Sequence, residues 1–171
     1  AVAAAAPFTL GQAILTSRGR SIGVVLKGLD TEREFAVNDL ARKLVGGTWD
    51  GLAADAKTPG IVLGVELADR MGADVGGEIV LVSPSSIATP LGLLPKMQRF
   101  KVIGLLKTGY YEYDNGTAWA DIRAASRFLG VEAGSAESLI QLGRGQTIED
   151  NARALDIVNE LDIHACFNLL L

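Results

Sequence analysis

The segment from Gln12 to Leu29 constrains the fold more than any other, because it contains two apolar runs separated by a short polar turn. Both runs are rich in Val, Ile and Leu, which favour β-strands. They meet at the sequence Ser-Arg-Gly-Arg, where Gly19 can supply the positive φ angle that a hairpin turn requires. The sequence therefore predicts a β-hairpin near the N-terminal end, and the rest of the fold must be built around it.

A helix is predicted directly after this hairpin, within the sequence DTEREFAVNDLARKLVGG. Thr31 and Glu34 have the spacing of a capping box, in which each side chain bonds a free backbone N–H of the first turn. Four apolar residues then recur at helical spacing on one face: Val37, Leu40, Ala41 and Leu44. Gly46 and Gly47 are expected to end the helix.

The remaining sequence mixes short strands with short helices. Helices are predicted from Glu66 to Met71, over RAASRFL, and from Thr147 over TIEDNARALDIVNEL. Strands are predicted over GIVLG, EIVLV, RFKVIGLL, TAWADI, ESLIQL and the apolar tail IHACFNLLL. These elements do not follow the strict βαβα order of a doubly wound sheet, so the sequence predicts an α+β fold with a β-rich centre.

Composition narrows the classes of function. Apolar residues make up 49% of the 171 residues, which is enough for a buried core. The net charge of -4 and the scattered basic residues argue against a nucleic-acid surface. No apolar run reaches the roughly 18 residues of a membrane-spanning helix. The sequence starts without Met and stops on CFNLLL, so we interpret it as a soluble segment of a longer protein.

Two pairs of residues could in principle perform chemistry. His164 and Cys166 are two apart, as in a nucleophilic dyad on one strand face, but the same spacing fits side chains that fill an apolar tail. Glu112 and Asp114 lie within YYEYDNG. They could be a catalytic pair of carboxylates, solvated residues of a turn, or part of a tyrosine-rich interface. We favour a structural role for both pairs, because a nucleophile also needs an oxyanion site and an orienting partner.

Motifs for cofactors and metals do not occur in the sequence. It contains no phosphate-binding loop, no dinucleotide fingerprint and no metal-ligand spacing. Cys166 is the single cysteine and therefore cannot form an intramolecular disulfide. We accordingly expect no cofactor, no metal and no enzymatic activity.

The connection between the predicted strands EIVLV and RFKVIGLL is long and apolar. Residues 83–99 are expected to form a loop that is stiffened by Pro84, Pro90 and Pro95 and carries Ile87, Leu91, Leu93, Leu94 and Met97. Lys96 and Arg99 add positive charge at its base. Such a loop could tuck into the core, form a flexible flap, or project as a pre-organised docking arm. We favour the docking arm, because a stiff loop loses little entropy on binding.

Several of these segments also resemble one family. The stretches GQAILTSRGRSIGVVLKGLDTEREFAVNDLARKLVGG, PGIVLGVELADRMGADVGGEIVLVSP, TPLGLLPKMQRFKVIGLLKTGYYEYD and TAWADI resemble the periplasmic domain of lipoprotein-releasing ABC transporter permeases of the Lol system. The resemblance runs from about Pro7 to about Leu161, with the motifs in the family's order. The broader relatives are periplasmic domains of macrolide-exporter-type permeases, which generally lack the proline loop.

The resemblance implies a two-lobed domain between two transmembrane helices, at the periplasmic face of the bacterial inner membrane. Residues 1–10 and 135–171 would form an α/β lobe, residues 11–134 an inserted β-rich lobe, and residues 83–99 a protruding hook. The family's hook pattern, Thr-Pro-x-Gly-x-x-Pro, is matched by Thr89, Pro90, Gly92 and Pro95.

The resemblance also implies that the hook recruits a soluble periplasmic lipoprotein carrier. The contact residues would be Thr89, Pro90, Leu91, Gly92, Leu93, Leu94, Pro95, Lys96, Met97 and Arg99, and the choice between Lys96 and Arg99 as the charged contact stays open. The full-length permease would bind a lipoprotein, a second permease copy or paralogue, and a cytoplasmic subunit that hydrolyses ATP. Two alternatives are a force-transmitting or adaptor-binding domain of an exporter-type permease, and a periplasmic hydrolase built on Glu112, Asp114 or His164.

Overall fold

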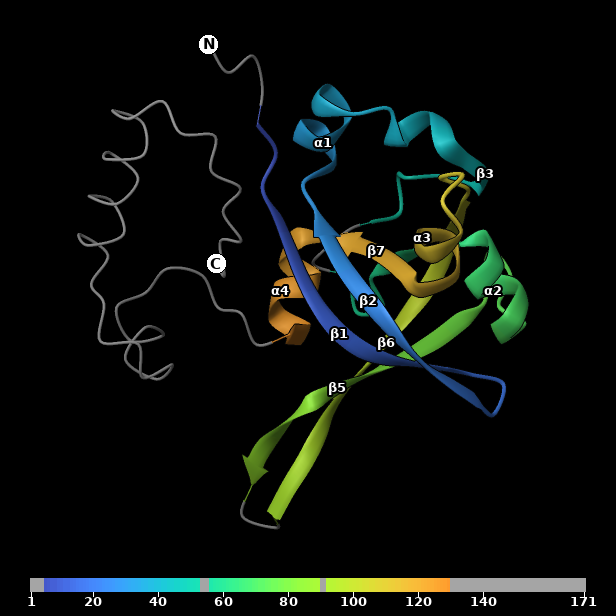
Figure 1. The fold of residues 1–171 in the computed structure, drawn as a ribbon. Coiled ribbons are helices and arrows are strands. Elements are labelled where there is room, and N and C mark those ends of the chain that lie inside the picture. Colours follow the sequence, from blue (N-terminus) through green and yellow to red (C-terminus); the bar gives the residue numbers. More distant parts are fainter. Residues whose placement is uncertain (1–4, 53–55, 90–91, 130–171) are drawn as a thin grey trace, which may run out of the picture. The chain divides into compact units, whose positions relative to one another are not determined.

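The computed structural model describes residues 5–52, 56–89 and 92–129 (Figure 1). This part of the chain is rich in strands and also holds four α-helices and a short 3-10 helix, so the predicted α+β fold class is confirmed. The predicted strand ESLIQL, the predicted helix from Thr147 and the predicted C-terminal strand lie outside the described residues.

The first two strands, β1 (Phe8–Ser17) and β2 (Arg20–Leu29), form the predicted hairpin. They pair antiparallel along their whole length. Arg18 and Gly19 connect them with φ angles of 47° and 77°. Two successive positive φ angles are typical of the type I′ turn, which matches the twist of the flanking strands. The hairpin prediction is therefore confirmed.

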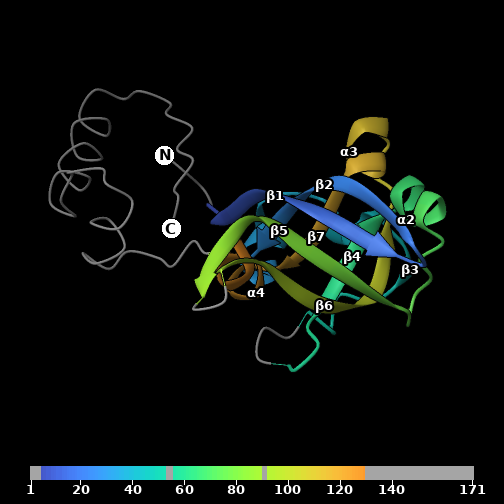
Figure 2. The same cartoon turned by 90° about the horizontal axis from the view of Figure 1, so that it is seen from below.

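The strands of the described part form one sheet that closes on itself. Besides β1 and β2 it contains β3 (Leu44–Gly47), β4 (Gly60–Gly64), β5 (Glu78–Thr89), β6 (Gly92–Leu106) and β7 (Thr117–Asp121). Their order is β3-β6-β4-β7-β2-β1-β5, and β5 also pairs with β6. This additional pairing closes the strands from β6 round to β5 into a barrel, and β3 joins β6 outside the ring (Figures 1 and 2). Closure removes most of the free edges of an open sheet.

Alternate side chains of the strands fill the barrel interior. Fully buried members of this cluster include Leu15, Leu26, Leu63, Leu81 and Phe100. Two helices, α2 (Val65–Met71) and α4 (Ile122–Leu129), add their own apolar side chains to it. α4 packs closely on β2 because Gly28 has no side chain: a Cβ there would lie 2.7 Å from the Cβ of Ala125.

A second apolar cluster lies on the other face of the sheet. Val62 and Trp119 each lie between two residues of the interior cluster, so their side chains point outward. They pack with Leu29 and Leu106, and the cluster is covered by Phe8, Leu40, Leu44, Trp49 and Ile103. The segment between β2 and β4 thus folds over the outside of the barrel.

The prediction of a single helix that starts at Thr31 and ends at Gly46 and Gly47 is wrong in its second half. α1 (Thr31–Val37) is followed by a 3-10 helix, η1 (Leu40–Lys43), and then by β3. The predicted capping box is also wrong, because Asp30 is the N-cap residue and its carboxylate accepts a hydrogen bond from the N–H of Arg33 at 3.3 Å.

Asn38 explains why the helix stops. Its side-chain amide donates to Glu34 at 2.8 Å, and its side-chain oxygen accepts from the N–H of Leu40 at 2.9 Å. Asparagine that bonds nearby backbone groups in this way competes with helix continuation. Glu34, which the capping box would leave at the surface, is instead buried and pairs with the ammonium group of Lys27 at 3.1 Å.

The segment YYEYDNG, expected as strand or turn, forms a short helix, α3 (Tyr111–Gly116). The other elements predicted within the described part are present: β4, α2 ending at Gly72 with a φ of 59°, the strands over EIVLV and RFKVIGLL, β7 and α4. The predicted lobe boundary between residues 10 and 11 falls inside β1. Residues 135–171 lie outside the described part, so the division into two lobes stays a prediction.

Candidate docking surface

β5 and β6 continue beyond the barrel and project from it as a long hairpin (Figure 1). Most of the segment predicted as a loop, residues 83–99, is therefore β-structure. The pairing runs as far as Thr89 opposite Gly92. The expectation of a loop is thus corrected to a two-stranded ribbon, which is a stiffer structure than a loop of the same length.

The prolines fit this ribbon because its outer edges are free of neighbouring strands. Pro84 falls where the pairing register shifts, between Val82 and Ser86, and Pro95 pairs opposite Ser86. Within the described residues, β1 pairs with β5 only up to Val82, and β4 pairs with β6 only from Lys101 onward. Proline has no N–H to donate, so it is tolerated at such edges and bulges.

The candidate contact residues follow one another along this ribbon. Thr89 ends β5, Gly92 begins β6, and Leu93, Leu94, Pro95, Lys96, Met97 and Arg99 follow in β6, while Pro90 and Leu91 lie outside the described residues. Among the described residues, Thr89, Gly92, Leu93 and Leu94 thus lie toward the far end of the hairpin, and Pro95, Lys96, Met97 and Arg99 lie toward its base.

At the base of the hairpin, side chains of β6 alternate between outside and inside. Pro95, Met97 and Arg99 are exposed, whereas Phe100 is fully buried. Met97 is 63% exposed, which is a large fraction for an apolar side chain. An exposed apolar side chain beside an exposed guanidinium is a combination found in protein interfaces.

The two cations at the base have different surroundings. Lys96 is half-buried, and its ammonium group donates to the backbone carbonyl of Arg127 near the end of α4. The side chain of Arg99 is 75% exposed and lies 4.0 Å from the carboxylate of Glu78, which is exposed as well. Lys96 therefore holds α4 to the hairpin, and Arg99 is accessible to a partner.

An apolar row extends from Met97 across the neighbouring strands. Val82 lies opposite Met97 on β5, and Ile14 lies opposite Val82 on β1. Ile14 is 41% exposed. Sequence reasoning missed Ile14 and Val82, because only the pairing of β1 with β5 brings them beside the hairpin base. The outward position of Ile14 in the β1–β2 hairpin was the signal from which this residue could have been identified as a surface candidate.

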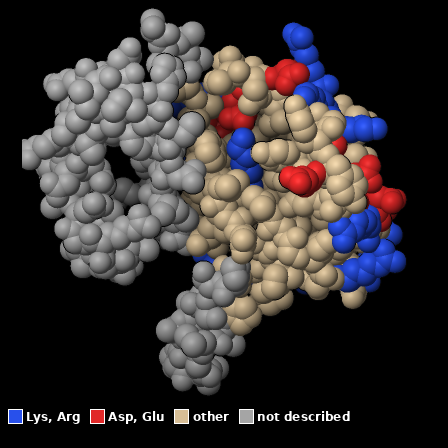
Figure 3. All heavy atoms as spheres, viewed as in Figure 1, with Lys and Arg blue, Asp and Glu red and all other residues tan. Residues whose placement is uncertain are grey.

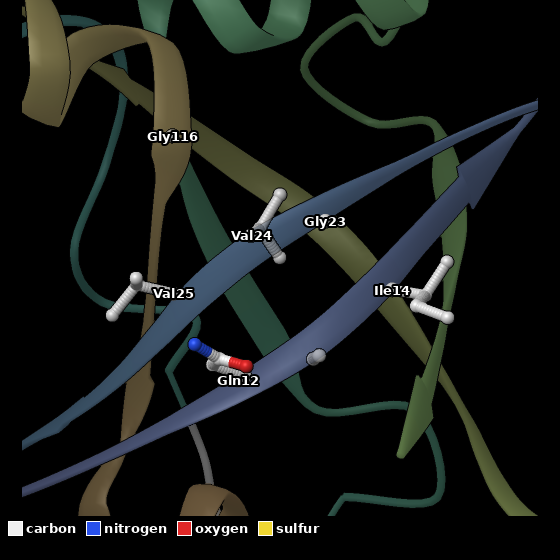
Figure 4. A pocket seen from close by; sticks show the side chains of 7 residues that line it. Gln12, Ile14, Gly23, Val24, Val25 and Gly116 are labelled. Atoms are coloured by element: carbon white, nitrogen blue, oxygen red, sulfur yellow. The ribbon is translucent and has the colours of Figure 1, made fainter. Parts of the chain in front are cut away.

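Ile14 also lines a shallow pocket of about 550 Å³ on the outer face of β1 and β2 (Figure 4). The lining residues are Gln12, Ala13, Ile14, Gly23, Val24, Val25 and Gly116. A Cβ at Gly23 or Gly116 would meet nothing within 4 Å, so these glycines leave the hollow open. The surface over β1, β2 and the hairpin base is mostly uncharged in Figure 3. The pocket can hold an apolar group, but its lining has no acid, base or nucleophile.

Glu112 and Asp114 do not form a catalytic pair. Glu112 is exposed and Asp114 is buried, because residues two apart in a helix do not share a face. One oxygen of Asp114 accepts hydrogen bonds from the N–H and the hydroxyl of Thr108, each at 2.7 Å, and the other accepts from the N–H of Gly109 at 3.2 Å.

The environment of Asp114 keeps its carboxylate ionised. Burial acts to raise the pKa of Asp114, but the hydrogen bonds from Thr108 and Gly109 and the charge of Lys107 outweigh burial and hold this pKa below its ordinary value. A carboxylate fixed in this way cannot serve as a general acid at neutral pH. Asp114 is therefore a structural group.

The other chemical candidates fall into two groups, those outside the described residues and those within them. His164 and Cys166 lie outside the described residues. Among the residues that are described, no three His, Cys, Asp or Glu side chains gather in a group that could hold a metal ion. No helix in the same part of the chain is long and apolar enough to cross a bilayer.

Comparison with known sequences places the chain among transporter proteins. It matches the family described as MacB-like periplasmic core domain over residues 1–157. It is 37% identical over 127 residues to the lipoprotein-releasing system transmembrane protein LolC of Neisseria meningitidis serogroup B, covering 72% of this chain and 29% of that protein. It is 31% identical over 162 residues to the LolC protein of Xylella fastidiosa, covering 95% and 37%. The chain thus spans about a third of the length of these relatives.

Comparison with solved structures supports the fold. The chain is similar to the extracellular domain of the noncanonic ABC-type transporter YknZ from Gram-positive bacteria, with a TM-score of 0.53 and 12% sequence identity. The similarity covers 82% of this chain and 70% of that one. At this level of identity the comparison concerns the fold alone.

Proposed function

The chain belongs to the family of MacB-like periplasmic core domains of ABC transporter permeases, and we propose that it receives a soluble lipoprotein carrier on its projecting hairpin. The full-length permease takes lipoproteins from the inner membrane, and the docked carrier accepts them. ATP is hydrolysed in a separate cytoplasmic subunit, and a second permease copy or a paralogue completes the membrane part. The names of the relatives, which are lipoprotein-releasing proteins, support this substrate class.

The projecting hairpin is the observation that supports the proposal most directly. A ribbon that is already folded loses little conformational entropy on binding, which leaves more of the contact energy as affinity. Its base presents the apolar row of Ile14, Val82 and Met97 beside the cation Arg99. A protein that carries acyl chains needs an apolar cavity, and an apolar ribbon with a charged base is complementary to the mouth of such a cavity.

Calorimetry with the periplasmic lipoprotein carrier of the same organism tests this proposal. A variant with Pro90, Leu93 and Pro95 replaced by alanine is expected to bind at least about tenfold more weakly, because a few central residues carry most of the energy of an interface. Circular dichroism checks that the variant is folded.

A control variant removes three exposed apolar side chains elsewhere. Val37, Val45 and Val75 are 49%, 58% and 44% exposed and lie outside the hairpin. Their triple replacement by alanine is expected to leave carrier affinity unchanged. Equal affinity of the hairpin variant and the wild type would overturn docking on the hairpin, and equal loss in both variants would show that the contact is not specific to it.

The structure also discriminates between the two cations at the hairpin base. Replacing Arg99 by glutamine is expected to slow association with the carrier roughly threefold to tenfold at low salt, since exposed charges act mainly on association rates. Replacing Lys96 by glutamine is expected to leave this rate unchanged and to lower thermal stability, because Lys96 contacts α4. Stopped-flow binding at two salt concentrations measures the rates. A larger rate effect for Lys96 than for Arg99 would contradict the assignment.

A second function is consistent with the same family. The domain could transmit force or bind an adaptor in an exporter-type permease, and the match of residues 1–157 to the MacB-like periplasmic core domain family is the observation that favours this reading. Failure of both the wild type and the hairpin variant to bind the carrier would favour this alternative.

A further inference from the structure

Three exposed tyrosines form a surface that the proposed docking does not use. Tyr110, Tyr111 and Tyr113 are 69%, 66% and 58% exposed and lie at the start of α3. We call these residues the tyrosine rim. The rings of Tyr110 and Tyr113 meet edge to face at 6.4 Å, so two of the three aromatic groups are packed together at the surface. Large aromatic side chains this exposed generally mark a contact surface.

The tyrosine rim stands on a rigid support. Asp114 receives three hydrogen bonds from Thr108 and Gly109, and its own N–H donates to the carbonyl of Tyr110 at 3.0 Å. Arg70 of α2 donates to the side chain of Asn115. Figure 2 shows α3 beside α2 and standing out from the barrel. The backbone that carries the rings is therefore held in place, which lowers the ordering that a contact made by them requires.

Basic residues lie in the two segments that adjoin the tyrosine rim. The N–H of Lys107 donates to the carbonyl of Lys43 at 3.0 Å, and the ammonium group of Lys43 donates to the carbonyl of Thr108 at 3.1 Å. These bonds join η1 to the chain that leads into α3. Arg42 and Lys107 are exposed. Two carboxylates, Asp39 and Glu112, lie in the same segments, and Asp39 is 3.7 Å from the ammonium group of Lys43.

We propose that the tyrosine rim, together with Arg42 and Lys107 of the adjoining segments, rests on the surface of a phospholipid bilayer. Tyrosine is the residue type that suits the boundary between headgroups and acyl chains, because its ring is apolar and its hydroxyl is polar. Lysine and arginine next to such rings attract anionic phosphates.

The position of the tyrosine rim agrees with this partner. α3 lies on the side of the barrel away from the projecting strands β5 and β6 in both views (Figures 1 and 2). This step rests on the proposed function: a hairpin that receives a soluble carrier points away from the membrane, so the opposite side of the barrel faces it. Because a permease would hold the domain at the membrane, even a weak contact would be occupied at the high effective concentration of lipid.

Co-sedimentation of the 171-residue chain with vesicles tests the inference. Vesicles of phosphatidylethanolamine with phosphatidylglycerol are expected to bind the chain more tightly than vesicles of phosphatidylcholine. A variant with Tyr110, Tyr111 and Tyr113 replaced by serine is expected to bind at least about tenfold more weakly, since affinity follows the apolar area placed in the interface. Replacing Arg42 and Lys107 by glutamine is expected to cost about fivefold per residue, on the anionic vesicles only.

A matched variant replaces exposed apolar residues elsewhere on the domain. Leu10 and Val75 are 47% and 44% exposed, and their replacement by serine is expected to leave vesicle binding unchanged. Absence of wild-type binding at every lipid concentration, or equal binding of the tyrosine variant, overturns the inference. Self-association of the wild type through the tyrosines, without lipid binding, also overturns the inference, because the tyrosine rim is then an interface between copies of the chain. None of these results depends on the carrier, so the vesicle experiment and the test of carrier docking can fail independently.

Discussion

Replacing Phe128 by alanine is expected to lower the free energy of unfolding by about 3–5 kcal/mol, the usual cost of truncating a fully buried phenylalanine. Phe128 has no exposed surface, and its ring packs edge to face against that of Phe100, with centroids 6.2 Å apart and planes at 86°. Truncation removes this aromatic contact and leaves a cavity between α4 and the barrel. Chemical denaturation followed by circular dichroism measures the loss.

The effect should reach the hairpin as well as the core. Phe100 lies in β6 at the point where the hairpin leaves the barrel, and Lys96 contacts α4 through the carbonyl of Arg127. Replacing Tyr111, which is 66% exposed, by alanine is the control and should change stability by no more than about 0.5 kcal/mol. Similar losses in the two variants would show that α4 does not hold the core as the packing indicates.

Local features of the fold were predictable because their signals lie within a few residues. The β1–β2 hairpin follows from two apolar runs and Gly19, and α2 ends at Gly72, which adopts the left-handed conformation that glycine tolerates. Barrel closure was not predictable in the same way. It depends on β5 pairing with both β1 and β6 and on the parallel pairs β2–β7 and β4–β6, and no local pattern specifies these partners.

The helix after β2 shows how a local pattern can mislead. Val37, Leu40 and Leu44 have helical spacing, but Leu40 and Leu44 are apolar because they cover the outer cluster on the barrel. A 3-10 turn and a strand achieve this burial as well as a helix does. Tertiary packing overrides a periodicity of so few residues.

The sequence could name the residues of the candidate docking surface but could not predict their conformation, and docking itself stays a prediction. The prolines suggested a loop because proline cannot donate in a strand ladder, yet a ribbon with free edges accommodates it. The sequence left Lys96 and Arg99 equivalent, and only the packing of α4 against β6 separates their surroundings. The position of Ile14 beside the hairpin base likewise depends on the long-range pairing of β1 with β5.

Replacing Asp114 by alanine is expected to lower the free energy of unfolding by about 1–3 kcal/mol, because the change leaves part-buried donors without their acceptor. The donors concerned are the N–H and hydroxyl of Thr108 and the N–H of Gly109. The neighbouring carboxylate provides the control: Glu112 is exposed, and its replacement by alanine should have almost no effect. Equal effects at the two positions would contradict the structural role of Asp114.

The same carboxylate predicts a pH dependence whose sign follows from its pKa, which lies below the ordinary value in the folded chain. The unfolded chain takes up the proton first as the pH falls, so the contribution of Asp114 is complete at neutral pH and is lost as the pH drops below about 4 and through the lowered pKa. An Asp114→Asn variant has no proton to gain. The difference in the free energy of unfolding between this variant and the wild type should therefore shrink in acid. A difference that stayed constant from neutral pH to a pH of about 3 would show that the charge of Asp114 does not contribute to stability. Because Asp114 also fixes the turn below Tyr110, Tyr111 and Tyr113, the acid-induced loss should loosen the tyrosine rim in the same pH range.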